Sequence, residues 1–197
     1  TTQEGIVENY SLGGLYSVKE PIEQLVDRMV EPAVVGLSSY VWNVAYNEAL
    51  AKEIKRRYPE CKMIIGGAET PNKSQDFFAD KPHIDYLIHQ EGEASFTGLL
   101  QSFIGLKSDE EVPGISINKA GKTLMTGPSQ RIQDLSEVPS PYTMGLFDHL
   151  PDMYPGKIWN AVIETNRGCP FMCTFCDWGG TTFSKVKKFG LERIEAE

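Results

Sequence analysis

The sequence predicts an α/β fold built on a doubly wound parallel sheet. Short, continuous runs of β-branched and apolar residues, typical of strands buried on both faces, alternate with segments whose apolar residues repeat at the i, i+3, i+4, i+7 spacing of a helix. Strands and helices that alternate at this interval are joined by right-handed crossovers. A chain of 197 residues, 41% apolar and 23% charged, has enough material for a packed core.

The elements of this sheet follow one another from residue 20 onwards. The three predicted strands cover 33–39, 62–65 and 84–88. The three predicted helices cover 20–30, 43 to about 57, and a segment that includes 96–103. Pro21 suits the first position of the first helix, and Glu31-Pro32 ends it. Asn43 is a favourable capping residue for the second.

The pattern changes after the third helix. Residues 114–125 alternate in polarity around Ala120-Gly121, which predicts a β-hairpin. Residues 133–145 contain two prolines and predict an ordered linker, and a last strand is expected over 158–164. We therefore divide the chain into an α/β domain (1–107), a hairpin and linker (108–155) and a third segment (156–197).

Ligands of parallel sheets bind beyond the carboxyl ends of the strands. Small and polar residues at these ends are the candidates for a binding face: Ser38, Ser39, Gly66, Gly67, Glu91 and Gly92. Each also has a plain structural interpretation. The serines and glycines are the strand ends and turns that any such sheet needs, and Glu91 can cap the following helix, whose dipole favours acidic groups at that end.

Three of the four cysteines lie close together on a loop that follows the last predicted strand. Cys169, Cys173 and Cys176 form a C-x3-C-x2-C pattern. Three thiolates can hold three irons of a cubane cluster and leave one iron open, whereas an electron-carrying cluster normally has four cysteines. The alternative is a structural zinc site, but zinc cysteine pairs usually come twice and the sequence has no second pair.

This loop, including Phe175 just before the third cysteine, resembles the cluster loop of the radical S-adenosylmethionine superfamily. The resemblance implies a 4Fe–4S cluster on Cys169, Cys173 and Cys176, with S-adenosylmethionine on the open iron and its adenine against Phe175. It also implies reductive cleavage of S-adenosylmethionine to a 5′-deoxyadenosyl radical, and an electron-donating reductase such as a flavodoxin or ferredoxin.

The segments before the loop sharpen the resemblance. The order Gly36-Leu37-Ser38-Ser39, Ile64-Ile65-Gly66-Gly67, Glu91-Gly92-Glu93 and Pro139-Ser140-Pro141 is similar to radical S-adenosylmethionine proteins with a cobalamin-binding domain. The resemblance implies that the carboxyl-end residues face cobalamin, with Trp42 either a corrin contact or a packed aromatic. The sequence has no Asp-x-His-x-x-Gly motif, so cobalamin would be held without a lower histidine, or the domain has kept the fold and lost the cofactor.

The same resemblance implies an additional strand and helix before about residue 8 and the rest of a partial (β/α) barrel after residue 197, so that we read the chain as a piece of an enzyme. Methyl transfer from cobalamin to an unactivated carbon of a small molecule is the reaction best motivated by this pairing of cofactors, although other radical reactions are compatible with it. The alternative is a non-catalytic module that binds a corrinoid or another small ligand and carries a structural metal site.

Composition narrows the partners and the compartment. The formal charge of −8 argues against a nucleic-acid partner, which requires a basic face. No apolar run approaches the roughly 20 residues that span a bilayer, and the first residues do not form a secretory signal. Three clustered thiols favour a reducing compartment, so we expect a cytoplasmic protein.

Overall fold

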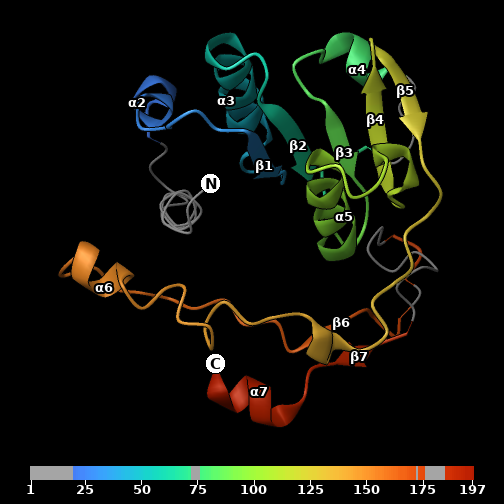
Figure 1. The fold of residues 1–197 in the computed structure, drawn as a ribbon. Coiled ribbons are helices and arrows are strands. Elements are labelled where there is room, and N and C mark those ends of the chain that lie inside the picture. The colour runs from blue at the N-terminus through green and yellow to red at the C-terminus, as the bar shows by residue number, and fades with distance from the viewer. Residues whose placement is uncertain (1–19, 72–75, 172, 176–184) are drawn as a thin grey trace. The chain divides into compact units, whose positions relative to one another are not determined.

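The computed structural model describes residues 20–71, 76–171, 173–175 and 185–197. The chain divides into two compact units, one through Arg131 and one from Ile132. Figure 1 shows the sheet of the first unit with its helices, and the short helices and strands of the second. The first unit has the predicted α/β fold.

The first unit contains a five-stranded sheet in the order β1-β2-β3-β4-β5. Its strands are β1 (Val34–Ser38), β2 (Lys62–Gly66), β3 (Tyr86–Ile88), β4 (Ile115–Lys119) and β5 (Lys122–Met125). The first three are parallel, with Leu37 opposite Ile65 and Ile65 opposite Leu87. The predicted hairpin, β4 and β5, is confirmed and pairs antiparallel with β3. The sheet therefore combines a parallel core with an antiparallel edge.

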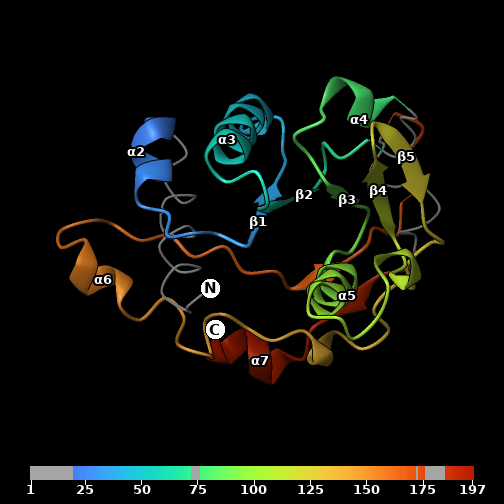
Figure 2. The same ribbon diagram turned by 45° about the horizontal axis from the view of Figure 1, so that its top comes forward.

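Helices cover both faces of this sheet, as Figure 2 shows. They are α2 (Ile22–Asp27), α3 (Val44–Arg57), α4 (Phe77–Asp80) and α5 (Glu93–Phe103), with a 3-10 turn, η1, at Asp109–Glu111. Successive strand residues point to opposite faces. Met63 and Leu87 belong to a buried cluster with Ile54 of α3, whereas Ile64 belongs to a second cluster with Leu99 of α5. Two buried cores thus hold the sheet between its helices.

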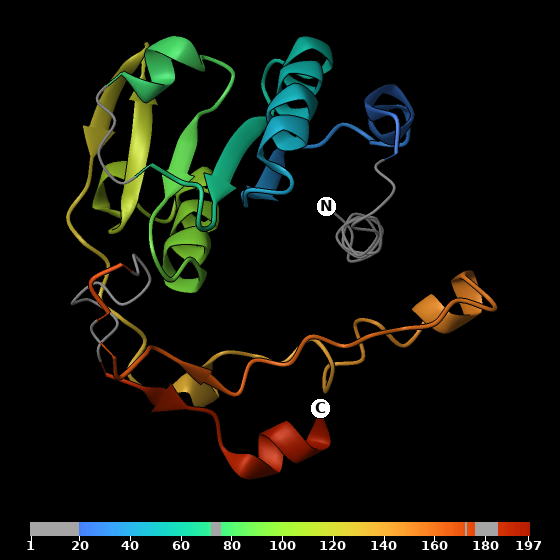
Figure 3. The same ribbon diagram turned by 180° about the vertical axis from the view of Figure 1, so that it is seen from behind.

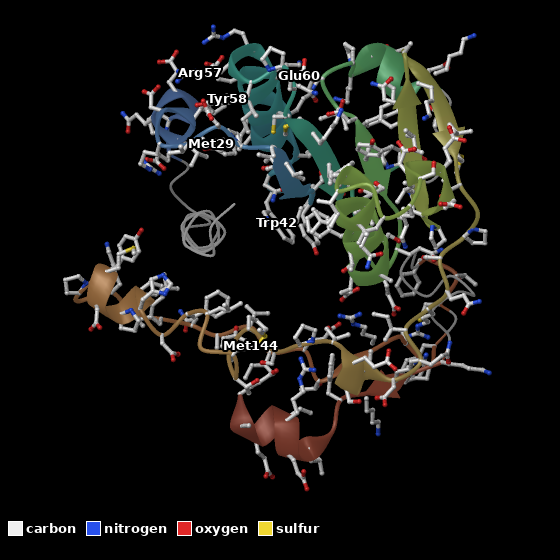
Figure 4. The ribbon with its side chains drawn as sticks, viewed as in Figure 1. Met29, Trp42, Arg57, Tyr58, Glu60 and Met144 are labelled. Atoms are coloured by element: carbon white, nitrogen blue, oxygen red, sulfur yellow. The ribbon has the colours of Figure 1, made fainter. Side chains whose placement is uncertain are left out.

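Side chains at the end of α3 attach α2 to this frame. The Tyr58 hydroxyl donates to the Met29 carbonyl at 2.9 Å, and Figure 4 labels both residues beside α2. Arg57 forms an ion pair with Asp27 of α2 and a second one with Glu53. The first predicted helix is present but shorter than expected, because it ends at Asp27.

The expectation that residues 33–39 form a strand buried on both faces is wrong about burial. Val34, Val35 and Leu37 are only half-buried, and Gly36 is exposed. Among the described residues β1 has a strand partner on one side only, which is β2. A β-branched apolar run therefore marked a strand correctly but did not reveal how much of it its neighbours cover.

The described residues of the second unit form little regular structure. Its elements are the 3-10 turn η2 (Leu135–Glu137), α6 (Leu150–Met153), β6 (Asn166–Arg167), β7 (Lys187–Lys188) and α7 (Leu191–Ala196). The strand expected over 158–164 is wrong, because those residues have no regular structure and β6 begins only at Asn166. Ile158 is 91% exposed, so this apolar segment is not buried against a sheet. The neighbouring strand β7 pairs with Asn166 and Arg167, beyond the end of the segment.

A few polar side chains hold the second unit together. Arg193 lies 4.3 Å from the ring centre of Phe189 and also donates to the Leu135 carbonyl at 3.3 Å. The Tyr142 hydroxyl donates to the Val162 carbonyl at 3.0 Å and accepts from the Val162 amide at 3.1 Å. In the described part of the chain, no helix has the length and apolar character needed to cross a membrane.

Candidate cofactor edge and cysteine loop

The carboxyl ends of β1 and β2 are locked to each other by backbone hydrogen bonds. The Ser39 amide donates to the Gly66 carbonyl at 2.6 Å, and the Ser39 carbonyl accepts from the Glu69 amide at 3.0 Å. The Thr70 amide donates to the Gly67 carbonyl at 3.0 Å and closes the turn after β2. Four of the predicted face residues, Ser38, Ser39, Gly66 and Gly67, are therefore brought together.

Gly67 is required by this close approach. Its φ is +107°, a region that side chains disfavour, and a Cβ placed on it would lie 2.6 Å from the Ser39 oxygen and 2.9 Å from the Ser39 nitrogen. Both of those atoms belong to the backbone and cannot move aside without breaking the lock. The glycine thus has a structural reason beyond turn preference.

Two asparagines fix the loop that follows β1. The side-chain amides of Asn43 and Asn47 both donate to the Ser38 carbonyl, at 2.9 and 2.7 Å. The Asn43 side-chain oxygen accepts from the Tyr40 amide at 2.7 Å. Sequence reasoning identified Asn43 only as a helix cap and missed Asn47, which is buried. A second asparagine four residues along the same helix was the available signal, since it lies on the same face.

An aromatic pair stands on this loop. The rings of Tyr40 and Trp42 are stacked, with centroids 4.8 Å apart and planes 2° apart, yet 55% of Trp42 is exposed. Figure 4 shows Trp42 at the lower end of the sheet. Trp42 was expected to be either a corrin contact or a packed aromatic, and an exposure of 55% does not fit a side chain packed in the core. The loop instead presents a flat apolar surface at the carboxyl edge.

The turn after β3 carries the last two predicted face residues. Glu91 forms an ion pair with Arg131 at 3.2 Å, and Gly92 is the N-cap of α5. Gln90, just before them, has a φ of +60°. Arg131 was not identified from the sequence, because it lies forty residues from Glu91 in a segment with no periodic pattern.

A small cavity lies beside the lock, between α3 and α4. Its lining includes Ser39, Ile65, Glu69 and His83. The Thr70 hydroxyl and the His83 Nε2 atom are buried without a hydrogen-bond partner among the described residues. Burial lowers the pKa of His83 below its usual value, which favours a neutral imidazole that can donate or accept a hydrogen bond. Buried polar atoms that lack a partner are rare and point to a missing one.

The cysteine loop begins directly after β6. Cys169 is half-buried and Cys173 is exposed, so both thiols are accessible to a metal. Phe175 is 91% exposed. Cys176 lies outside the described residues, so the three-thiolate set remains a prediction.

Comparison with known proteins decides the family. Residues 7–100 match the B12 binding domain family. Over 180 residues, or 90% of the chain, the sequence is 38% identical to the cobalamin-dependent radical SAM methyltransferase TokK of Streptomyces tokunonensis. The chain belongs to the radical S-adenosylmethionine proteins that carry a B12-binding domain. The sequence resemblance is thus confirmed.

Other relatives of this radical S-adenosylmethionine protein agree. It is 34% identical over 195 residues to the 2-(S-pantetheinyl)-carbapenam-3-carboxylate methyltransferase of Streptantibioticus cattleyicolor, covering 92% of this chain. The chain spans about a quarter of the length of these relatives, 26% of TokK and 28% of the second enzyme.

Solved structures show the same fold. The apo form of OxsB, a cobalamin-dependent S-adenosylmethionine radical enzyme, matches with a TM-score of 0.67 at 21% identity over 98% of this chain and 27% of its own. The radical S-adenosylmethionine methyltransferase TsrM from Kitasatospora setae, bound to tryptophan and a SAM analogue, matches with a TM-score of 0.60 at 15% identity over 88% of this chain and 35% of its own.

We predict that Gly67→Ala destabilises the first unit more than Gly105→Ala does. Gly105 also has a positive φ, +78°, but a Cβ there meets nothing within 4 Å. Both variants carry the backbone strain of a left-handed alanine, roughly 1–3 kcal/mol. Only Gly67→Ala adds the clash with Ser39, which overpacking data place at about 1–3 kcal/mol more. Urea unfolding measures both, and equal losses would contradict the backbone lock.

Proposed function

We propose that this chain binds cobalamin along the carboxyl edge of β1, β2 and β3 and holds a 4Fe–4S cluster with Cys169, Cys173 and Cys176. It would do so within an enzyme that reductively cleaves S-adenosylmethionine. The observation that carries the proposal is the backbone lock of Ser39 with the Gly66–Gly67 turn, inside the segment that matches B12-binding domains. Ligands of open α/β sheets bind at this edge.

The chemistry of the edge fits cobalamin. Cobalamin is a broad, flat macrocycle with amide side chains and a nucleotide tail. The exposed Tyr40–Trp42 stack offers an aromatic surface for the macrocycle. Thr70, in the turn after β2, offers a buried hydroxyl for its polar groups, and Gly67 lets a ligand approach the backbone closely. Because the sequence has no Asp-x-His-x-x-Gly motif, the histidine ligand of that motif would be absent.

The cysteine loop fits an iron–sulfur cluster. Thiolates are the usual ligands of such clusters, and Cys169 and Cys173 lie on an accessible loop. When bound, cobalamin would supply a methyl group and the cluster the electron that cleaves S-adenosylmethionine. Phe175, whose ring is exposed, would pack on the adenine of that ligand and orient it.

The reaction we propose is methyl transfer to an unactivated carbon of a small molecule. TokK and the carbapenam enzyme of S. cattleyicolor are methyltransferases by name, which supports this choice. Reduction of the cluster requires an electron donor, for which we propose a flavodoxin or ferredoxin. Clustered thiols that must stay reduced are typical of a reducing compartment, so we place the protein in the cytoplasm.

The proposal predicts that Trp42→Ala weakens the binding of hydroxocobalamin by roughly three- to tenfold, the loss expected for one aromatic stacking partner. The matched control is Trp159→Ala, because Trp159 is 46% exposed and also paired with a tyrosine, but belongs to the second unit. Equilibrium dialysis with absorbance detection measures both affinities. Absence of binding by the unmutated protein would overturn the cobalamin assignment.

The cluster is tested with two cysteine variants of the full-length protein, reconstituted anaerobically with iron and sulfide. Cys173→Ala should abolish S-adenosylmethionine cleavage and leave hydroxocobalamin affinity unchanged. Cys61→Ala should retain both, because Cys61 is buried in the core and burial raises the pKa of its thiol to about 11. Electron paramagnetic resonance of the reduced protein reports the cluster. Stoichiometric zinc without a cluster would favour the structural metal site.

A further inference from the structure

The first unit ends at the carboxyl edge of the sheet, which also carries the candidate cofactor face. β4 is antiparallel to β3, and β5 is antiparallel to β4. β5 therefore runs in the same direction as β1, β2 and β3, and its carboxyl end lies at the edge where theirs lie. Figure 3 shows β2 and β5 pointing the same way.

The residues after β5 are bonded back onto this edge. The Thr126 amide donates to the Ile115 carbonyl at 3.0 Å, and the Gly114 amide donates to the Gly127 carbonyl at 2.7 Å. The Gly114 carbonyl in turn accepts from the amide of His89, the residue after β3, at 2.9 Å. The segment after the hairpin is thus attached, through the start of β4, to the turn that follows β3.

Arg131 completes this attachment. Its Nε atom lies 3.2 Å from a Glu91 carboxylate oxygen, and the two side chains are only 15% and 9% exposed. An ion pair so far removed from water is screened less by salt than an exposed pair. The neighbouring Gln90 has a φ of +60°, which a non-glycine residue keeps only where its surroundings hold it. The ion pair therefore holds a turn whose conformation is costly.

We propose that Arg131 is a positioning residue for cobalamin, holding the Gln90–Gly92 turn in its binding conformation through the ion pair with Glu91. This inference rests on the proposed function. Glu91 was expected to contact the cofactor directly, whereas here it acts through its ion pair with Arg131. We call this ion pair the clamp. Gly92, the N-cap of α5, is the residue of this turn whose backbone we expect to face the ligand.

The clamp predicts a specific pattern of hydroxocobalamin affinities in the full-length protein. Arg131→Gln and Glu91→Gln should each weaken binding roughly tenfold, because affinity falls with the fraction of molecules whose turn is in the binding conformation. The double variant should lose no more than either single one, since both remove the same interaction. Arg131→Lys, which keeps the charge, should recover most of the affinity.

The matched control is Lys55→Gln. Lys55 forms a partly buried ion pair with Asp85 at 2.9 Å, at the opposite end of β3 in the same unit. It should lower the free energy of unfolding and leave hydroxocobalamin affinity unchanged. If the unmutated protein does not bind hydroxocobalamin, the proposed function fails. If it binds and Arg131→Gln binds equally well, or Lys55→Gln weakens binding as much, the clamp alone is overturned.

Discussion

The contact between the Ser39 backbone and the Gly66–Gly67 turn is the constraint on which the carboxyl edge depends. It brings two strand ends within hydrogen-bonding distance and leaves no space for a side chain at Gly67. Asn43 and Asn47 hold the adjoining loop through one carbonyl, that of Ser38, and so determine where Tyr40 and Trp42 stand. The aromatic surface and the position of the buried Thr70 hydroxyl both follow from this geometry.

The sequence predicted the parts of this edge that depend on local chemistry. Apolar runs and helical spacing identified the strands, the long helices and the hairpin, because burial and periodicity are visible residue by residue. The exposure of β1 was missed, since an apolar run does not say how much of a strand its neighbours cover. The pairing of Glu91 with Arg131 was missed because it joins residues forty positions apart, which no periodic pattern connects.

In the second unit too, features set by neighbouring residues could be predicted from the sequence, whereas features that depend on distant residues could not. The spacing of Cys169, Cys173 and Cys176 indicates thiolate chemistry without any structure, because the ligands lie on one short loop. The strand expected over 158–164 depends on a partner, and β7 pairs with only two residues, Asn166 and Arg167. Apolar residues such as Ile158 and Phe175 remain exposed within this unit. The cysteine spacing alone does not show that the loop follows a B12-binding domain. The match of residues 7–100 to that family does.

Above all, we propose that cobalamin binds at the carboxyl edge of β1, β2 and β3. Hydrogen–deuterium exchange measured with and without hydroxocobalamin tests this most directly, because it reports every backbone segment of the sheet in one experiment. We predict slower exchange in peptides that cover 39–44, 67–70 and 90–92, and unchanged exchange at the opposite ends of the strands, in 61–63 and 83–85. Protection confined to the opposite ends, or no protection at all, would contradict the account.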